Sequence, residues 1–263
     1  MKLGKKKSLT KENWNAAMRD IEQIVPTADL ENRIDTTVSQ IQNLAKTKKL
    51  GLAWSGGKDS IALGWLMQQA GNFPSVLGIN HMEFPCFTQW VDKHQPDDLT
   101  VINSGHDISF LKEHPHLIFP SSKYGAFWAT RTYHTAQSRF FKDKKLDVIA
   151  LGRRTQDGNY VGGKGSNIYT TKQGITRWSP ISDWSHEEII ALLKYAGLTL
   201  PHVYDHVRGF QVATGGWHQR KGTSPDPSSP RYGWAETYRS HPEIVEEAAA
   251  HNLPGAADYL KGI

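Results

Sequence analysis

The six residues from Ser55 to Ser60, with the sequence SGGKDS, constrain this chain more than any other stretch. They follow a short apolar run, Leu50 to Trp54, and precede a helical pattern over Ile61 to Ala70. This placement predicts a loop between a buried strand and a helix. Gly56 and Gly57 allow the backbone to bend and to approach a ligand closely. Because the first N–H groups of a helix attract anions, the unit predicts a phosphate-binding loop.

The alternatives for this loop are a plain structural turn and two other nucleotide motifs. Glycine pairs are common in tight turns, and Ser and Asp also serve there as helix caps. The loop lacks the GxxxxGK[ST] pattern of P-loop proteins and the GxGxxG pattern of dinucleotide-binding folds. Six matched residues after an apolar strand favour anion binding over a bare turn. We therefore assign to nucleotide binding Ser55, Gly56, Gly57, Lys58, Asp59 and Ser60.

Further short apolar runs alternate with helical patterns along the chain. Strands are predicted at 76–79, 99–102, 148–151, 168–170 and 175–177. Helices are predicted at 87–94, 126–142 and 186–196. The last two strands lie in a glycine-rich stretch and predict a hairpin. This alternation predicts an α/β fold, an open and mostly parallel sheet with helices on both faces.

We divide the chain into three parts. Residues 1–48 predict an N-terminal helical extension of two helices, and residues 49–217 the nucleotide-binding α/β domain. Residues 218–263 predict an irregular C-terminal region. It starts with a Pro- and Ser-rich loop and continues as one helical segment over about 235–251.

The sequence SGGKDS after a β-strand resembles the PP-loop of the adenine nucleotide alpha-hydrolase superfamily, the N-type ATP pyrophosphatases. Three later stretches resemble its phosphoadenosine phosphosulfate (PAPS) reductase-like branch. They are Gly78 to Pro85 after the second strand, Leu151 to Asp157 with a G-x-R-R pattern, and Trp178 to Trp184 before a helix. The order and spacing of these stretches over about 48–217 support the resemblance.

Two departures from that branch concern the reaction. The reductases act through a cysteine near the C-terminus, but Gly209 to Arg220 contains none, and the single cysteine, Cys86, follows the second strand. The reductases also tend to have a degenerate PP-loop, because their substrate lacks the β–γ pyrophosphate. The intact loop of this chain therefore implies ATP as the ligand, and the resemblance argues against thiol-dependent reduction.

The resemblance implies further nucleotide-binding residues after the second and fourth strands. Asn80 and His81 stand where relatives contact the adenosine. Gly152 and Arg153 follow the fourth strand, at the edge where open α/β sheets bind ligands. His and Asn are also ordinary residues at strand ends, and this reading of Asn80 and His81 stays open.

Charged residues of the same stretches are the candidates for catalysis and metal binding. Arginine binds phosphate oxygens through two hydrogen bonds and keeps its charge. We therefore expect Lys58, Arg153 and Arg154 to be catalytic, with a surface ion pair as the alternative for the arginines. Asp59 and Asp157 are the candidate ligands of Mg²⁺. The alternatives are a helix cap for Asp59, and a contact to a ribose hydroxyl or a turn aspartate for Asp157.

Composition limits the ligands, cofactors and partners that the chain is expected to bind. The net charge of +5 and the pI near 9.1 suit polyanions such as nucleotides and nucleic acid. One cysteine cannot form an internal disulfide or ligate an iron–sulfur cluster, and the histidines show no zinc-binding spacing, so we expect neither cluster nor structural zinc. No apolar run approaches the ~18–20 residues of a membrane span. The start of the chain lacks the apolar stretch of a signal peptide, so we expect a cytoplasmic protein without a membrane partner.

Together these patterns predict an enzyme that binds ATP with Mg²⁺ and cleaves it at the α-phosphate. Pyrophosphate is released, and an acceptor is activated or modified. The acceptor stays open and includes nucleic acid, which the basic, aromatic segment from Trp217 to Lys221 would suit. A homo-oligomer is compatible with the sequence. One alternative is an enzyme that uses PAPS or adenylylsulfate without a thiol of its own. Another is a non-catalytic module that binds a nucleotide or nucleic acid.

Overall fold

A six-stranded sheet forms the centre of the computed structural model, which describes residues 3–4, 6–121, 123–220 and 222–262. The strand order is β3-β2-β1-β4-β6-β5, and every neighbouring pair is parallel except β5 with β6. The strands are β1 (Leu50–Ala53), β2 (Ser75–Ile79), β3 (Leu99–Asn103), β4 (Val148–Leu151), β5 (Ile168–Thr170) and β6 (Thr176–Trp178). The predicted mostly parallel sheet and its hairpin are confirmed, with the last strand one residue later than predicted.

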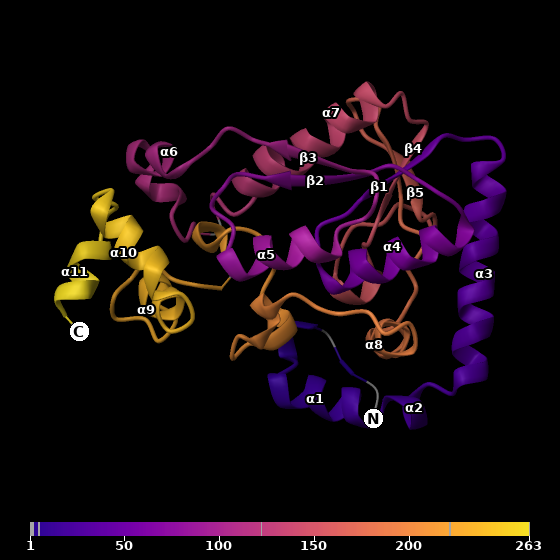
Figure 1. Cartoon of the computed structure of the whole chain (residues 1–263), viewed down its shortest axis with the longest axis horizontal. Helices are drawn as coiled ribbons and strands as arrows, with labels where there is room; N and C mark the ends of the chain where they lie inside the picture. The colour runs from indigo at the N-terminus through magenta and orange to yellow at the C-terminus, as the bar shows by residue number, and fades with distance from the viewer. Residues whose placement is uncertain (1–2, 5, 122, 221, 263) are drawn as a thin grey trace.

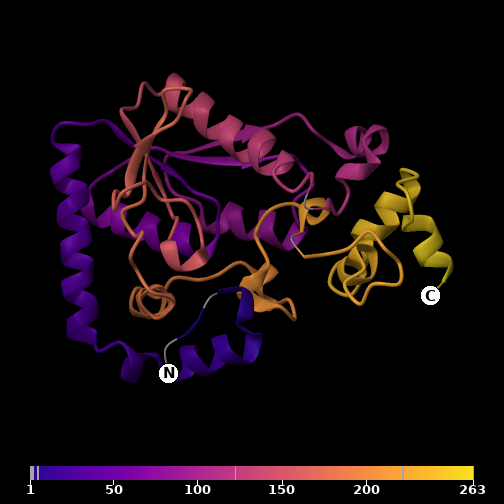
Figure 2. The same cartoon turned by 180° about the vertical axis from the view of Figure 1, so that it is seen from behind.

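Helices cover both faces of the sheet, as the sequence predicted. Figures 1 and 2 show α7 (Thr135–Asp143) on one face, with α4 (Lys58–Ala70) and α5 (Pro85–His94) on the other. Helix α8 (His186–Tyr195) packs against α4. The central strands β1 and β4 are buried along their whole length, so the apolar core lies between this sheet and its two helical layers.

The N-terminal region contains three helices where two were predicted. They are α1 (Lys11–Arg19), α2 (Ile21–Ile24) and α3 (Thr27–Ala45). Asp20 leaves the helical conformation between α1 and α2. Pro26 then precedes α3, which packs against α4 and α8 at one edge of the molecule (Figure 1). The extension therefore shares the core of the α/β domain.

The C-terminal region gathers at the end of the molecule opposite α3 (Figure 1). The prediction of one helical segment over about 235–251 is wrong, because two helices, α9 (Gly233–Tyr238) and α10 (Pro242–Ala250), occupy this stretch. The residue before a proline is disfavoured in the helical conformation, and His241 has φ −149° and ψ 75°. A further helix, α11 (Ala256–Lys261), packs against α10.

The predicted helix at 126–142 is confirmed in place but not in type throughout. Its first part is a π-helix, η3 (Ala129–His134), which continues directly into α7. The remaining helical pieces are α6 (Ile108–Glu113) and the 3₁₀ turns η1 (Lys6–Ser8), η2 (Pro115–Leu117), η4 (Thr155–Asp157), η5 (His202–Asp205), η6 (Gly209–Gln211) and η7 (Trp217–Gln219). Among the described residues, no helix is both long and apolar enough to cross a membrane.

Candidate functional site

A cavity of about 330 Å³ opens at the carboxyl ends of β1, β2 and β4, and we call it the strand-end cavity. The carboxyl ends of parallel strands are the usual ligand-binding edge of such sheets. Its walls come from the loop after β1, from β2, from η3 and α7, from the segment after β4, and from the stretch 213–215. Of the predicted nucleotide-binding residues, the cavity brings together Ser55, Gly57, Asp59, Ser60, Gly152 and Arg153.

The loop between β1 and α4 is held by its own hydroxyl groups and by a distant segment. The Ser55 N–H donates to Ser60 Oγ (3.1 Å), and Ser60 Oγ donates to the Gly57 carbonyl (2.9 Å). Thr214 Oγ1 donates to the Ser55 carbonyl at 2.8 Å. Gly57 is the N-cap of α4 and provides no side-chain capping bond. The positive end of this helix therefore faces the cavity, with Asp59 in its first turn and the Lys58 N–H donating to the Tyr204 hydroxyl at 3.2 Å.

Two glycines are required by close approaches around the loop. Gly56 has φ +62°, and a Cβ there would lie 2.6 Å from the Phe87 ring. A Cβ on Gly152 would lie 2.9 Å from the backbone carbonyl carbon of Asp59 and from the Ser60 nitrogen. The segment after β4 therefore packs directly on the start of α4, which brings Arg153 to the rim of the cavity.

Arg153 lies on the cavity wall, fixed by two neighbouring side chains. Its guanidinium donates to the Tyr169 hydroxyl (3.0 Å) and to His134 Nε2 (3.2 Å). Burial, with Arg177 and Arg153 nearby, lowers the pKa of His134 to about 4, so its imidazole is neutral and accepts this hydrogen bond. Neither partner is a carboxylate, so the charge of Arg153 stays available to an anion in the cavity.

Arg154 turns away from the cavity into a buried ionic cluster. Its guanidinium contacts Asp59 Oδ1 at 2.8 Å and Asp157 Oδ2 at 2.9 Å. It also donates to His186 Nδ1 at 2.9 Å, and burial lowers the pKa of His186 to about 3. Arg154 is fully buried. It therefore ties the start of α4 to η4 and α8 and does not line the cavity.

Lys58 is also buried on the far side of the loop. Its Nζ lies 2.7 Å from both carboxylate oxygens of Asp59 and 5.8 Å from the centre of the Trp14 ring. Burial lowers the pKa of Lys58 to about 8 against the attraction of Asp59. Burial alone would raise the pKa of Asp59, but Lys58 and Arg154 outweigh it and hold the pKa at about 2. The two form a charged pair beneath the loop.

The expected Mg²⁺ ligands, Asp59 and Asp157, do not fit a metal ion in this arrangement. Both oxygens of Asp59 already contact Lys58, and Arg154 lies between the two carboxylates. Magnesium requires oxygen ligands in near-octahedral order, and the cations of Lys58 and Arg154 contact three of these four carboxylate oxygens. Over the part of the chain that the structure describes, no group of three or more His, Cys, Asp or Glu residues could hold a metal ion.

The predicted residues after β2 are not on the cavity wall. Asn80 is fully buried; its amide lies 3.2 Å from His218 Nε2, and its Oδ1 accepts from the Met82 N–H at 3.1 Å. His81 is exposed and has φ +60°. Asn80 shapes the turn that carries Glu83 into the cavity, and His81 takes its left-handed position.

Among the side chains that sequence reasoning missed, Glu83, Tyr133, Gln137 and Thr214 line the cavity. Glu83 Oε1 accepts from the Asn80 N–H at 3.0 Å, and burial raises the pKa of Glu83. Gln219 donates to the Tyr133 hydroxyl at 2.8 Å. Glu83 lies within the resembling stretch after β2, which was its only signal. Tyr133 comes from the π-helix η3, Gln137 from α7, and Thr214 from a segment distant in sequence.

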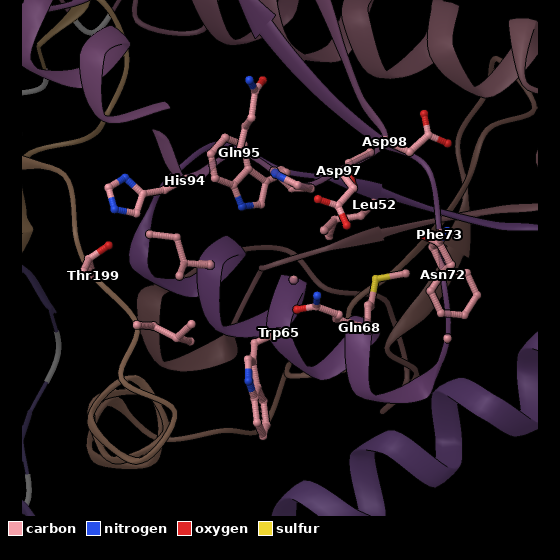
Figure 3. A pocket seen from close by; sticks show the side chains of 18 of the residues that line it. Leu52, Trp65, Gln68, Asn72, Phe73, His94, Gln95, Asp97, Asp98 and Thr199 are labelled. Atoms are coloured by element: carbon pink, nitrogen blue, oxygen red, sulfur yellow. The ribbon is translucent and has the colours of Figure 1, made fainter. Parts of the chain in front are cut away.

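A second cavity, of about 340 Å³, lies beside α4 and is shown in Figure 3. Trp65 and Gln68 of α4 line it together with His94 and Asp97 (Figure 3). The described lining contains no lysine or arginine and includes two aspartates, Asp97 and Asp98. An anionic nucleotide would find no cation there, so the strand-end cavity is the candidate site.

Comparison with known proteins identifies the family of this chain. Residues 49–221 match the phosphoadenosine phosphosulfate reductase domain family. A comparison with curated proteins gives no match. Among solved structures, the chain is similar to a PAPS reductase from Candida auris in complex with phosphate (15% identity, TM-score 0.53, 80% of this chain and 97% of that chain).

Two other solved structures align with lower scores. One is an FMN adenylyltransferase from Candida glabrata in complex with FAD and inorganic pyrophosphate, with 16% identity, a TM-score of 0.48, and coverage of 75% of this chain and 69% of that chain. The other is a U34-tRNA thiolase from Methanococcus maripaludis with its [4Fe-4S] cluster, with 14% identity, a TM-score of 0.44, and coverage of 89% and 80%.

Proposed function

Because the chain belongs to the phosphoadenosine phosphosulfate reductase domain family, we propose that it binds ATP in the strand-end cavity and cleaves it between the α and β phosphates. The observation that carries the proposal is the amino end of α4. Its N-cap residue, Gly57, makes no side-chain capping bond, and the hydroxyl groups of Ser55 and Ser60 and the guanidinium of Arg153 lie on the same cavity. Helix N–H groups, hydroxyls and a guanidinium together favour a phosphate chain.

In the proposed reaction, the β and γ phosphates lie against the Ser55–Ser60 loop. An acceptor oxygen attacks the α-phosphorus, the bond from this phosphorus to the α–β bridging oxygen breaks, and pyrophosphate leaves with the electron pair. Charge grows on the leaving pyrophosphate, where the loop N–H groups and Arg153 stabilise it. No step depends on a metal ligand of the protein.

The three residues expected to be catalytic take different roles in this proposal. Arg153 contacts the nucleotide directly. Lys58 and Arg154 are positioning residues, because their side chains end on Asp59 rather than at the cavity. Together they neutralise Asp59 and Asp157, which would otherwise repel a phosphate chain near the loop.

The position of Cys86 supports a reaction without an internal thiol. Its Sγ lies 3.2 Å from His241 Nε2, and Cys86 lines a different cavity from the one that contains the loop. This is the single cysteine of the sequence. We therefore propose ATP, with an intact β–γ pyrophosphate for the loop, rather than a thiol-dependent reduction of PAPS.

The test is incubation of the protein with α-labelled ATP and candidate acceptors, with chromatographic separation of AMP or adenylated product from ADP. We expect labelled AMP or adenylate together with pyrophosphate. Arg153→Gln should abolish most of this product. Arg139→Gln is the matched control, since Arg139 is an exposed arginine of α7 that pairs with Asp143 and touches no part of the cavity.

Two results would overturn the proposal. Release of ADP without AMP would place cleavage between the β and γ phosphates. Calorimetry that shows binding of PAPS but not of ATP would identify an enzyme of the sulfur-nucleotide type.

A further inference from the structure

A third cavity, of about 600 Å³, lies where the C-terminal helices meet the α/β domain, and we call it the arginine cavity. One side comes from the start of α5 and from η5 with the residues after it, and the other from α9 and the approach to α10. In Figure 1 this is the region between α5 and α9. None of its described lining residues also lines the strand-end cavity. It is therefore a separate site.

Its inner wall holds more positive than negative charge. Arg208 forms a short ion pair with Glu236 Oε1, and Arg220 Nη1 lies 3.7 Å from the same oxygen. His206 Nε2 also approaches this oxygen at 3.6 Å. Burial and nearby arginines lower the pKa of His206 to about 3, so it adds no charge. Two guanidinium groups thus face one carboxylate.

Arg220 is the group that this arrangement leaves short of partners. Only 5% of the residue is exposed, and its Nε and Nη1 have no hydrogen-bond acceptor among the described residues. Its guanidinium lies over the Phe84 ring at 4.2 Å, which orients it without satisfying its N–H groups. Burial lowers the pKa of Arg220 to about 10, so the group keeps its charge at neutral pH. A buried, under-bonded cation is costly unless an anion joins it.

The mouth of the cavity is positively charged as well. Arg231 and Arg239 line it and are exposed, so four arginines surround a space that two described acidic residues, Asp205 and Glu236, also line. We propose that the arginine cavity binds an oxyanion, a phosphate or sulfate group carried by a small molecule. Guanidinium groups pair with such oxygens through two parallel hydrogen bonds. The volume exceeds that of one tetrahedral ion. This inference goes beyond the proposed reaction and does not depend on it.

Cys86 and His241 lie on the wall of the same cavity and supply a reporter. Burial raises the pKa of the Cys86 thiol and lowers that of His241, so the pair rests as neutral thiol and imidazole. We therefore assign no nucleophilic catalysis to this pair. The arginines bind the oxyanion, and Cys86 reports on whether the cavity is occupied. Because the sequence has one cysteine, any thiol reagent reports on this cavity alone.

The experiment follows alkylation of Cys86 by iodoacetamide, read by intact mass, with rising inorganic phosphate or pyrophosphate and with chloride at equal ionic strength. We expect saturable protection by the oxyanions and none by chloride. Arg220→Gln should weaken the protecting affinity by about tenfold or more. Since Arg220 is buried, the exposed pair Arg231→Gln with Arg239→Gln serves as a second variant that keeps the fold.

The control is Arg153→Gln, in the strand-end cavity, which should leave the protection unchanged. Alkylation that phosphate and pyrophosphate slow no more than chloride does would overturn the inference. So would protection that persists in the Arg231 and Arg239 variant and disappears in Arg153→Gln, because the anion would then act from the strand-end cavity. Neither result bears on ATP cleavage, so the proposed function is tested separately.

Discussion

Arg153 and Arg154 show how one residue step separates two roles. The backbone after β4 is extended, with Arg154 at φ −130° and ψ 146°. Successive side chains of an extended segment point to opposite sides. Arg153 therefore reaches the strand-end cavity, and Arg154 enters the cluster with Asp59 and Asp157. Of these two neighbouring arginines, Arg153 is thus available to a ligand, and Arg154 stabilises the fold.

This separation predicts different effects of the same substitution. Arg153→Gln should weaken ATP binding by about tenfold or more, since it removes a charge-assisted contact, with little change in stability. Arg154→Gln should destabilise the protein by about 3–5 kcal/mol, because two carboxylates lose their buried partner. Calorimetry with ATP and urea unfolding measure the two effects. Equal loss of stability in both variants would contradict the assignment.

Gly152 gives a second prediction at this scale. A Cβ in Gly152→Ala would meet the backbone of Asp59 and Ser60 at 2.9 Å, and neither strand end nor helix start can move away cheaply. We expect destabilisation of about 1–3 kcal/mol and weaker ATP binding. Gly163→Ala is the control, since its nearest neighbour would be the Tyr160 hydroxyl at 3.6 Å. Thermal unfolding measures the stability, and calorimetry measures the affinity for ATP. A Gly152→Ala protein with unchanged stability and affinity would refute the close packing.

Four of the six predicted loop residues line the strand-end cavity, but the loop sequence did not predict which way each side chain points. Ser55, Gly57 and Ser60 line the cavity because the strand–loop–helix geometry alone places them there. Lys58 points away because it meets Asp59 and the Trp14 ring, and Trp14 belongs to a helix that precedes the domain. Such contacts between distant segments leave no periodic signal in the sequence.

At the scale of elements, the parallel strands were predicted well because each is a short apolar run between turn signals. Breaks within helices were predicted less well. The π-helix η3 is an example of such an irregularity within a helix. A Cβ on Gly78 would lie 2.9 Å from the Thr132 carbonyl, so the helix is held close against β2 by tertiary packing. Helical periodicity at 126–142 gives no indication of that widened turn.

Helix α1 is an element whose role became visible only in the structure. Trp14 is 1% exposed and meets the rings of His186 and Phe210 edge to face, at 4.8 and 5.0 Å. Together with the Lys58 contact, this makes α1 the cover of the charged pair beneath the loop. Helix α1 therefore shields this charged pair from water.

The corresponding prediction is that Trp14→Ala destabilises the protein by about 3–5 kcal/mol, through the cavity it leaves. It should also weaken ATP binding, because water reaching Lys58 loosens its pairing with Asp59 and so the start of α4. Met18→Ala on the same helix is the control, since Met18 is 37% exposed. Urea unfolding and calorimetry measure both effects, and matching values for the two variants would disprove a covering role.

Across the whole molecule, four buried or half-buried histidines lie in separate parts of the fold. Burial lowers the pKa of His134 to about 4, and of His186, His206 and His218 to about 3. They lie at the strand-end cavity, the ionic cluster, the arginine cavity and the turn after β2. Each is neutral in the folded protein but titrates near 6.5 when unfolded. The stability of the folded protein therefore depends on four histidines that stay unprotonated.

This dependence fixes the sign of the last prediction. Below about pH 6.5 the unfolded chain binds protons that the folded protein excludes, so stability falls as the pH falls from 6.5 toward 4. His218 is 0% exposed and should contribute up to about 1.4 kcal/mol of this loss per pH unit. In His218→Gln, stability at neutral pH should drop, because Asn80 loses its partner, while the slope with pH becomes shallower. His116→Gln, at an exposed histidine, should change neither. Urea unfolding at several pH values measures the slopes, and an unchanged slope in His218→Gln would show that this histidine is not held neutral by burial.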